Sequence, residues 1–379
     1  MTWTAIPWQG ARMPTAPTLT DGTVTLRAHR EDDAQGAFEQ CQDPVSQEWT
    51  TVPLPYSLED GRRFVTELMP QGWADGSTWG FAVEVEGRYA GTVELRDEGE
   101  GRLEVAYGSH PWVRGSGAME RAVRLLVDWG FEDRQARVIV WRANKGNWAS
   151  RKLAWRLGFT IEGTIRAALA QRGELRDAWV GTLLATDDRE PKGEWLVVPV
   201  LDAEGLRLRP WQESDVPRIV EACSDERTQF WLGQMPHPYD DAQALAWLEH
   251  QAENRARGSS VAWAVVDPAD DVALASVSYF GLVPEVEAEI GYWAHPDARG
   301  RGVMTRAMAV VVRHLFEEVG VRRVSAGAAV DNVASRRVIE ANGLRQFGIE
   351  RLGTVVRTGR ADIAWYDVLL EEWRAAQRA

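Results

Sequence analysis

The sequence predicts an α/β chain built from two copies of one domain. Residues 104–119 (EVAYGSHPWVRGSGAM) return as residues 289–304 (EIGYWAHPDARGRGVM), which is a shift of 185 positions from 104 to 289. The same shift carries Asn147 onto Asn332. A constant shift over such a length indicates an internal repeat. In each copy, segments typical of strands precede a Gly-x-Gly turn and a segment typical of a helix.

The repeat sets the expected domain organisation. A chain of 379 residues is long enough for two or three domains, each with its own core. We expect an N-terminal arm over 1–19, a first domain over 20–186, a linker over 187–202 and a second domain over 203–379. The linker is rich in polar and turn-forming residues, and a strand is expected in it at Trp195–Val200.

Composition excludes several classes of protein. Hydrophobic residues make up 45% and charged residues 26%, which is ordinary for a soluble globular chain. The net charge of −13 argues against non-specific nucleic-acid binding and leaves room for a cationic acceptor. No apolar run approaches the roughly 18 residues that span a bilayer, and the N-terminus does not resemble a signal peptide. We therefore expect a cytoplasmic enzyme with no membrane partner.

The two cysteines, Cys41 and Cys223, are 182 positions apart, which is also the shift from Trp49 to Trp231 in this earlier part of each copy. They therefore occupy equivalent points of the two copies. Equivalent points of a tandem repeat have no special reason to be adjacent, so we expect no disulfide. Two cysteines and six histidines in the whole chain show no metal-ligand spacing. No metal is expected.

Each copy begins with a short strand that leads into an acidic helix start. The strands are expected at Val24–Arg27 and Leu206–Arg209, and the helix starts at Arg30–Ala34 and Gln212–Val216, where early carboxylates suit a helix N-terminus. Matched aromatic and proline landmarks follow: Trp49 with Trp231, and Pro55-Tyr56 with Pro238-Tyr239. Another helix comes next in each copy.

The middle of each copy reads as three strands, a helix, a strand and a short helix. The strands are expected at Trp79–Glu86, Tyr89–Arg96 and Arg102–Ser109 in the first copy, and at Val261–Val266, Ala273–Phe280 and Ala288–Ala294 in the second. The helices are expected at Ala118–Trp129 and Met304–Val319, and the next strands at Arg137–Trp141 and Arg323–Gly327. The short helix then ends at Gly158 or Gly343, because glycine is a common helix stop.

The Gly-x-Gly turns are candidates for anion binding. Gly115 and Gly117, like Gly300 and Gly302, let the backbone turn tightly and bring N–H groups close to a ligand. The following helix adds free N–H groups and the positive end of its dipole. Neighbouring arginines could add charge-assisted contacts: Arg114, Arg299 and Arg301. One such turn alone is better explained as a glycine-rich strand-to-helix turn with solvated arginines, but two copies in the same context favour phosphate binding.

These motifs resemble the GNAT superfamily of acyl-CoA N-acyltransferases, and especially its RimJ/RimL type. Three features carry the resemblance: Ala/Gly-Tyr-x-x-His-Pro-x-x-Arg-Gly-x-Gly, Asn-x-x-Ser, and the late pairs Arg176-Asp177 and Ala361-Asp362. The resemblance extends over both expected domains. Three positions before the first glycine the superfamily usually has Gln or Arg, whereas this chain has Trp112 and Asp297.

The resemblance implies a mixed, mostly antiparallel sheet in each domain, splayed between its fourth and fifth strands and flanked by helices. The pantetheine arm of acetyl-CoA, or of another acyl-CoA, would lie in the splay, and the glycine turns would take the pyrophosphate. The implied cofactor-binding residues are Tyr107, Gly108, Ser109, Val113, Arg114, Gly115, Ser116, Gly117, Ala118 and Asn147 in the first copy, and Tyr292, Trp293, Ala294, Ala298, Arg299, Gly300, Arg301, Gly302, Val303 and Asn332 in the second.

Acyl transfer to an amine needs one proton taken from the ammonium and one given to the leaving thiolate. Glu104 and Glu289 open the fourth strand, where superfamily members that use a glutamate base often place it. The alternative is that both are solvated carboxylates. Glu94 is a rival base in the first copy only, because the aligned Tyr279 carries no carboxylate.

The resemblance places Ser150 and Ser335 beside the cofactor sulfur, as groups that help protonate the thiolate. Asn-x-x-Ser spacing also suits a helix start, so helix capping remains an equal alternative for the serines and the favoured one for the asparagines. Tyr107 and Tyr292 are interpreted as packing residues, and His110 and His295 as turn residues. The chain has 19 tryptophans, which are interpreted mainly as core residues; an alternative is that Trp73, Trp79, Trp148 and Trp293 line an aromatic acceptor or acyl cavity.

The sequence thus predicts an acyl-CoA-dependent N-acyltransferase, and most simply an acetyltransferase. Its acceptor would be a primary amine of a peptide N-terminus or a small molecule, attacking directly in a ternary complex. Two alternatives stay open: one half could be a non-catalytic CoA-binding or scaffold module, or the donor could be a thioester on an acyl carrier protein. The two copies could pair as a pseudo-two-fold monomer, or the chain could form a homodimer.

Overall fold

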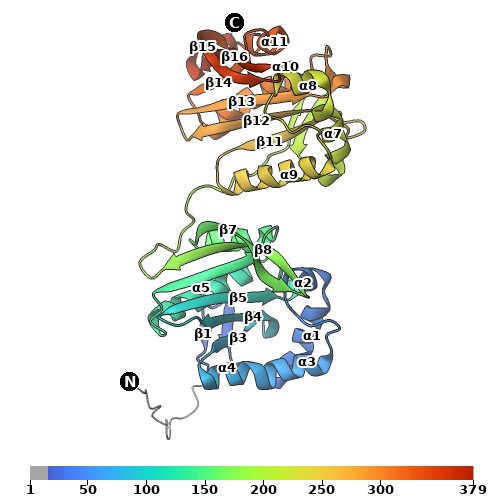
Figure 1. The fold of residues 1–379 in the computed structure, drawn as a ribbon. Coiled ribbons are helices and arrows are strands. Elements are labelled where there is room, and N and C mark those ends of the chain that lie inside the picture. The colour runs from blue at the N-terminus through green and yellow to red at the C-terminus, as the bar shows by residue number, and fades with distance from the viewer. Residues whose placement is uncertain (1–15, 379) are drawn as a thin grey trace, which may run out of the picture. The chain divides into compact units, whose positions relative to one another are not determined.

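The computed structural model describes residues 16–378, so most of the expected N-terminal arm lies outside the described residues. The chain divides into two compact units, Met1–Lys192 and Gly193–Ala379 (Figure 1). Each unit has its own hydrophobic core. We describe each unit by itself.

The first unit is built on one eight-stranded sheet in the order β1-β2-β3-β4-β5-β6-β8-β7. Its pairs are antiparallel except for β5 with β6, which is parallel. The strands are β1 (Leu19–Thr20), β2 (Val24–Arg27), β3 (Thr78–Val85), β4 (Arg88–Asp97), β5 (Arg102–Ser109), β6 (Val138–Asn144), β7 (Thr160–Gln171) and β8 (Glu174–Leu184).

The second unit repeats this sheet, in the order β9-β10-β11-β12-β13-β14-β16-β15. Here β13 with β14 is the parallel pair. The strands are β9 (Leu201–Ala203), β10 (Leu206–Pro210), β11 (Val261–Val266), β12 (Ala273–Val283), β13 (Glu287–Ala294), β14 (Arg323–Ala329), β15 (Arg345–Val356) and β16 (Gly359–Leu369). The predicted fold class, two tandem domains with mixed and mostly antiparallel sheets, is confirmed.

Helices flank both sheets. The first unit contains α1 (Ala34–Gln42), α2 (Pro44–Trp49), α3 (Leu58–Arg63), α4 (Met69–Asp75), α5 (Ala118–Glu132) and α6 (Trp148–Arg156). The second unit contains α7 (Val216–Ser224), α8 (Glu226–Trp231), α9 (Asp241–Ala256), α10 (Val303–His314), α11 (Val333–Ala341) and α12 (Leu370–Ala376). Over residues 16–378, no helix combines the length and apolar character that crossing a membrane requires.

The main core of each unit lies between the sheet and its long central helix. In the first unit, Val123 and Leu126 of α5 pack in one cluster with Leu103 and Val105 of β5. In the second unit, α10 packs in the same way against Ala288 and Ile290 of β13. Because side chains alternate along a strand, the residues between these apolar positions face the opposite side of the sheet. Glu104 and Glu289 are therefore on the face away from α5 and α10.

The strands splay at the same place in both units. The register of β5 with β6 covers Arg102–Val105 only, although β5 continues to Ser109 alongside β4. The register of β13 with β14 covers Glu287–Glu289 only, although β13 continues to Ala294 alongside β12. The last residues of β5 and of β13 are thus paired on one side only, and their backbone groups on the other side face the gap. The strands expected from the sequence began at β2 and at β10, so β5 and β6, like β13 and β14, are the fourth and fifth of them. This is the splay that the family resemblance implied.

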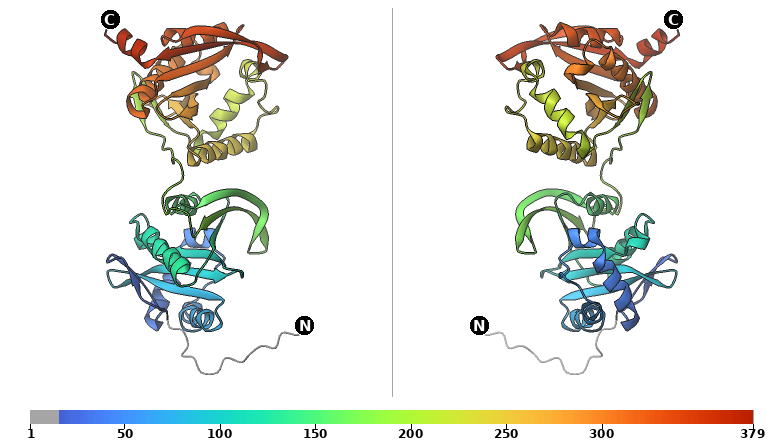
Figure 2. Two further views of the ribbon diagram at one scale, coloured as in Figure 1. Left: turned by 90° about the vertical axis from the view of Figure 1, so that its left-hand side faces the viewer. Right: turned by 90° about the vertical axis from the view of Figure 1, so that its right-hand side faces the viewer.

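Three expectations need correction. Trp195–Val200 is not a strand. The N–H of Leu196 donates to the carbonyl of Arg255, and the indole N–H of Trp263 donates to the carbonyl of Pro199. Pro199 has no N–H with which to pair a neighbouring strand. The helix expected over Met304–Val319 is α-helical only to His314 and continues as a π-helical turn. The third error is an omission, because the long hairpins β7-β8 and β15-β16 were not predicted; Figure 2 shows β7-β8 as a bent green arch.

The expected linker is divided between the two units. Arg189, before the division, accepts a hydrogen bond from Arg124 of α5 through its carbonyl group. Val198, after the division, is buried in the second core. The exact bounds of the domains stay a prediction, but both ends of this segment pack on the unit that they adjoin.

Candidate active site

The two Gly-x-Gly turns adopt the conformation that suits an anion site. Gly117 and Gly302 precede α5 and α10 in the left-handed region, with φ of 83° and 69°. Gly115 and Gly300 also have positive φ, which favours glycine. A Cβ built on any of the four would meet no atom within 4 Å. The turns therefore leave open space at the N-terminus of a helix, where a phosphate group would be stabilised.

Arg114 and Arg299 do not point at these turns. The guanidinium of Arg114 bonds Asp43 at 2.6 Å, and Asp43 in turn caps α2. Arg299 makes the same ion pair with Asp225, the cap of α8. In both units this arginine ties the glycine turn to a neighbouring helix. Its assignment to cofactor binding stays a prediction, and its observed contacts are structural.

The residue between the two glycines differs between the units. The hydroxyl of Ser116 accepts from Ala118 N–H at 3.3 Å, so it already satisfies one free donor of α5. At the matching position the second unit has Arg301, which is exposed and bonds only the carbonyl of Asp297, at 3.3 Å, among the described residues. The second turn therefore carries an additional positive charge and keeps its first helical N–H free of a side-chain cap.

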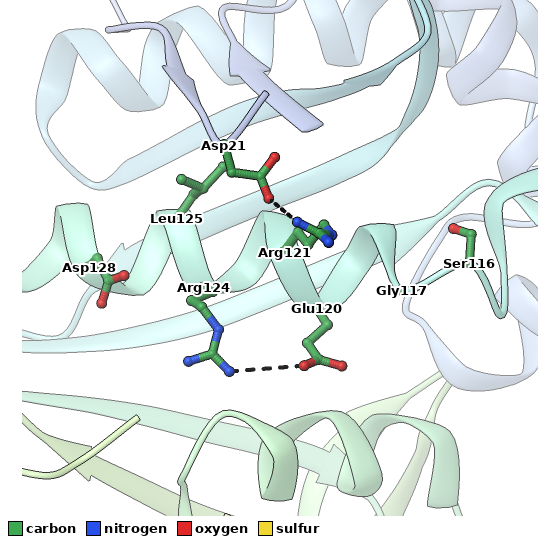
Figure 3. A pocket seen from close by; sticks show the side chains of 8 residues that line it. All are labelled: Asp21, Ser116, Gly117, Glu120, Arg121, Arg124, Leu125 and Asp128. Carbon is green, nitrogen blue, oxygen red and sulfur yellow. Dashed lines mark hydrogen bonds and ion pairs between the residues drawn. The ribbon is translucent and has the colours of Figure 1, made fainter. Parts of the chain in front are cut away.

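A shallow depression follows α5 from its glycine turn (Figure 3). Four of its five charged side chains are paired with one another: Asp21 with Arg121 at 2.8 Å, and Glu120 with Arg124 at 3.9 Å. Burial alone would raise the pKa of Asp21, but hydrogen bonds from Val24 N–H and Arg121 outweigh it and bring the pKa to about 2. Asp21 is therefore ionised at neutral pH and holds the guanidinium of Arg121, so this arginine is less available to an anionic ligand.

The splay is bridged in each unit by a tyrosine and a serine. The hydroxyl of Tyr107 lies 2.8 Å from Ser150 Oγ, and that of Tyr292 lies 2.9 Å from Ser335 Oγ. Both tyrosines have a pKa raised to about 12 because they are buried. Each hydroxyl therefore holds its proton at neutral pH. Sequence reasoning missed this pairing, because the partners are 43 residues apart.

The asparagines of Asn-x-x-Ser act as helix caps. The side chain of Asn147 accepts from Ser150 N–H at 3.1 Å, and that of Asn332 accepts from Ser335 N–H at 3.2 Å. Helix capping was the interpretation that the sequence favoured for both asparagines. It fixes the first turn of α6 and α11, and hence the place of each serine hydroxyl.

Glu104 lies in a group of charged residues that we call the charged cluster: Glu94, Arg96, Glu98, Glu104 and Arg142. Arg142 contacts Glu104 at 3.0 Å, and Arg96 contacts its other oxygen at 3.6 Å. Arg96 also bonds Glu94, and Arg142 bonds Glu98, which lowers the pKa of Glu98. Both oxygens of Glu104 are thus engaged by guanidinium groups.

Glu289 has no such partners. Across the sheet, Phe280 stands opposite Glu289 where Arg96 stands opposite Glu104. Gly327 takes the place of Arg142 on the next strand. Burial, with the nearby charge of Glu287, raises the pKa of Glu289. A half-buried carboxylate of raised pKa is a better proton acceptor than an ordinary one.

The residue that replaces Glu94 is Ser278 rather than Tyr279. Glu94 stands opposite Ala106, whose repeat equivalent is Gly291, and Gly291 stands opposite Ser278. Tyr279 lies on the other face, in the core. The alignment by a shift of 185 was therefore wrong by one residue on this strand. The conclusion that the second unit has no carboxylate there is unchanged.

The turn histidines are held in place by local bonds. Nδ1 of His110 accepts from Trp112 N–H at 3.4 Å, and Nδ1 of His295 accepts from Asp297 N–H at 3.1 Å. Nε2 of His295 lies 3.1 Å from Glu221, and Nε2 of His110 lies 3.4 Å from Glu39. These contacts agree with the interpretation of both as turn residues.

The four tryptophans proposed to line a cavity pack against other aromatic rings. Trp73 and Trp79 are buried in the first core beside Trp129. Trp148 lies 4.6 Å from Trp179 between ring centroids, and Trp293 stacks on Trp211 at 5.6 Å. The interpretation as core residues therefore holds for Trp73 and Trp79. None of the four lines the depression of Figure 3.

Cys41 and Cys223 are both buried free thiols. Burial raises the pKa of Cys41 to about 11 and that of Cys223 to about 12. Neither thiol is ionised at neutral pH, and a thiol must be ionised to act as a nucleophile. Within residues 16–378, no group of three or more histidine, cysteine or acidic residues is arranged to hold a metal.

Comparison with known proteins agrees with this geometry. The family model "Acetyltransferase (GNAT) domain" matches residues 23–160 and again 205–345, which together are more than half of the chain. The chain is 38% identical over 87 residues to the Bacillus subtilis protein named "Putative ribosomal N-acetyltransferase YdaF". That match covers 23% of this chain and 48% of YdaF, so it spans about half of that relative.

Two further likenesses extend the comparison. The "Ribosomal-protein-serine acetyltransferase" of Escherichia coli is 24% identical over 27% of this chain and 58% of its own length. A solved GCN5-related N-acetyltransferase from Brucella melitensis is 26% identical, with a TM-score of 0.43, over 48% of this chain and 84% of that one. With a GNAT domain model matched twice along its length, the chain belongs to the GNAT acetyltransferase family, as two domains in tandem.

Proposed function

We propose that this protein transfers an acetyl group from acetyl-CoA to a primary amine, by direct attack, and that its second unit is the principal site. One observation carries this proposal. On one face of the second splay lies Glu289, with a raised pKa and no cationic partner among the described residues, and at the gap lies the Tyr292–Ser335 pair. Glu289 and Tyr292 thus lie on opposite faces of β13, near the point where β13 and β14 separate.

The residues present fit an acyl-CoA. The open glycine turn before α10, with Arg301 beside it, suits a pyrophosphate group. The free backbone edge of Tyr292–Ala294 suits the amides of a pantetheine arm. When bound, acyl-CoA supplies the acyl group as an activated thioester. Arg299 would contribute by holding the turn against α8.

Glu289 would take the proton from the attacking ammonium. A lysine-like amine has a pKa near 10.4, so nearly all of it is protonated at neutral pH. A correctly placed base contributes roughly 10²- to 10⁴-fold to the rate. The raised pKa of Glu289 makes it a stronger base, and it still leaves a deprotonated form to act when the pH exceeds that pKa.

Ser335 and Tyr292 would assist the leaving group. Ser335 Oγ lies on the first turn of α11, where the cap Asn332 holds it. Its hydroxyl can turn a proton toward the sulfur while Tyr292, protonated at neutral pH, donates to the serine oxygen. In the first unit Trp141 Nε1 also donates to Ser150 Oγ, at 3.1 Å.

The first unit is less well suited to the same chemistry. Both oxygens of Glu104 are engaged by Arg96 and Arg142, so this carboxylate is held in ion pairs and is a poorer proton acceptor. The hydroxyl of Ser116 already accepts a hydrogen bond from Ala118 N–H, at the start of the helix that would hold the pyrophosphate. We therefore assign the first unit a binding or scaffold role, with weak turnover at most.

Two further considerations bear on the acceptor and on the order of events. The relatives from B. subtilis and E. coli bear names that refer to ribosomal proteins, which supports a peptide or protein amine as acceptor. Both cysteines are buried and un-ionised, so a covalent acyl-cysteine step has no suitable nucleophile. Direct attack in a ternary complex remains the simplest route.

Calorimetric titration with acetyl-CoA tests the cofactor assignment. We expect Gly302→Glu to abolish binding to the second unit, because the new side chain brings negative charge to the phosphate position and strains a backbone at φ of 69°. The matched Gly117→Glu variant should leave that binding site, and acetylation of amines, intact.

The opposite result would refute the assignment. Loss of acetylation in Gly117→Glu but not in Gly302→Glu would place the active site in the first unit. A wild-type protein that binds no acetyl-CoA would contradict the proposed donor. Circular dichroism of each variant should match the wild type, so that a loss of binding reports the site.

The pH profile of kcat/KM should reflect the raised pKa of Glu289. A base works deprotonated, so activity should fall as pH decreases through that pKa, at a higher pH than for an ordinary glutamate. Glu287→Gln removes one charge that raises this pKa, so the acidic limb should move to lower pH. Arg102→Gln, the matched change in the first unit, should leave the limb in place. A shift of the limb to higher pH in Glu287→Gln would be inconsistent with Glu289 as the base.

A further inference from the structure

Two aromatic rings stand over two glycines on the Glu289 face of the second sheet. A Cβ built on Gly291 would come within 2.8 Å of the ring of Phe280. A Cβ built on Gly327 would come within 2.9 Å of the ring of Trp365. Gly291 follows Glu289 by two positions on β13, and Gly327 lies on β14, across the splay. The ring of Phe280 therefore lies on one side of the splay, opposite Glu289, and the ring of Trp365 lies on the other side, over Gly327.

The first unit has no such rings at these places. Arg96 stands where Phe280 does, and Ala106 replaces Gly291. Arg142 replaces Gly327, and Val180, which pairs with it, replaces Trp365. The ring of Phe280 thus takes the place of the Arg96 side chain, and the ring of Trp365 covers Gly327, where the first unit has Arg142. The difference is confined to the face that carries the glutamate.

Trp365 is held by its neighbours in this position. Its indole Nε1 donates to Glu350 at 3.0 Å, and Glu350 is exposed. Ile363 lies on the same face and also crowds the space above Gly327, at 2.7 Å from the built Cβ. Because Glu350 holds the indole N–H of Trp365, the ring presents a fixed face beside the splay. The Glu350 carboxylate lies at the exposed end of this ring.

These features have a consequence for the acceptor. Aromatic faces attract cations and apolar groups, whereas the ion-paired side chains of the charged cluster present no aromatic face. An amine that reached Glu289 from this face of the sheet would have the ring of Phe280 beside it on β12 and the ring of Trp365 over Gly327 on β14.

We infer that Phe280 and Trp365 are specificity-determining residues, which select a primary amine carried on an apolar group. This inference rests on the proposed function and deepens it. The selected chemistry is the same for an arylalkyl amine and for a peptide N-terminus with an apolar first side chain. Glu350 contributes a negative charge at the outer end of the wall. The first unit, with its charged cluster, lacks this selectivity.

The test compares acetylation of phenylethylamine with that of ethanolamine by the full chain. The wild type should prefer phenylethylamine, mainly through a lower KM. Trp365→Val, which installs the residue of the first unit, should reduce this preference about tenfold, as expected for one lost ring contact. Trp365→Phe should restore most of it. Calorimetric affinity for acetyl-CoA should stay unchanged in both variants.

Val180→Ala is the matched control and should leave the preference unchanged, since it lies on the corresponding strand of the first unit. A wild type without preference, or a Trp365→Val variant that retains the full preference, would overturn this inference alone. Absence of acetyl transfer to any amine by the wild type would contradict the proposed function and this inference together. An N-terminal peptide pair, with Phe or Ser as first residue, distinguishes a peptide acceptor from a small amine.

Discussion

Replacing Glu289 by glutamine is expected to lower kcat/KM for amine acetylation by about 10²- to 10⁴-fold, which is the usual contribution of a positioned base. Glutamine keeps the size of the side chain and removes the proton acceptor. Because Glu289 has no cationic partner among the described residues, the change breaks no ion pair there. Steady-state kinetics at several pH values is the appropriate measurement. The acidic limb of the pH profile should also disappear from the residual activity.

Glu104→Gln is the matched control for this experiment. Glu104 is bound to Arg96 and Arg142, so its loss should perturb the charged cluster but change kcat/KM by less than about threefold, within the effect of one weak contact. A larger loss in Glu104→Gln than in Glu289→Gln would assign catalysis to the first unit. Equal losses in the two variants would indicate that both units work.

Asp215→Ala should destabilise the second unit by about 3–5 kcal/mol, which is the usual cost of leaving one member of a buried ion pair. Asp215 receives two hydrogen bonds from Arg209, both at 2.8 Å, and one from Gln212 N–H at 2.9 Å. Its side chain is only 6% exposed. The free energy of unfolding in urea, followed by tryptophan fluorescence, would measure the loss.

Asp271→Ala provides the control, because Asp271 contacts the same arginine at 2.9 Å but is 58% exposed. Solvent screens that pair, so its removal should cost less than about 1 kcal/mol. The first unit repeats the arrangement with Arg27 and Asp33, so Asp33→Ala should destabilise that unit by a comparable amount. A loss below about 1 kcal/mol for Asp215→Ala would show that Asp271 alone can stabilise Arg209.

Much of the fold could be predicted because its signals are local. The repeat, the glycine turns and the central strands follow from spacing and from alternation of apolar residues, which is why β2, β5 and α5 were located within a few residues. The hairpins β7-β8 and β15-β16 were missed for a physical reason. Both contain register shifts, such as those between Ile161 and Gly163 and between Gln346 and Gly348, which interrupt the alternation.

The error at Tyr279 shows how sensitive a strand is to alignment. The repeat is offset by 184 positions there and by 185 on the next strand, so one residue separates Ser278 from Tyr279. On a strand, one residue is the difference between the two faces. Only the register across β12 and β13 reveals which residue shares the face of Glu289.

The sequence by itself indicated that this chain is two tandem domains of the GNAT family, and it located the two glutamates, serines and glycine turns. These features are read along the chain, where spacing fixes them. Only the tertiary structure decided that the two copies differ: Glu104 is ion-paired with Arg96 and Arg142, whereas Glu289 stands opposite Phe280, with Trp365 over Gly327 on the far side of the splay. The electrostatic character of a carboxylate depends on its neighbours across strands. Those neighbours are tens of residues away in sequence and become adjacent only when the sheet has formed.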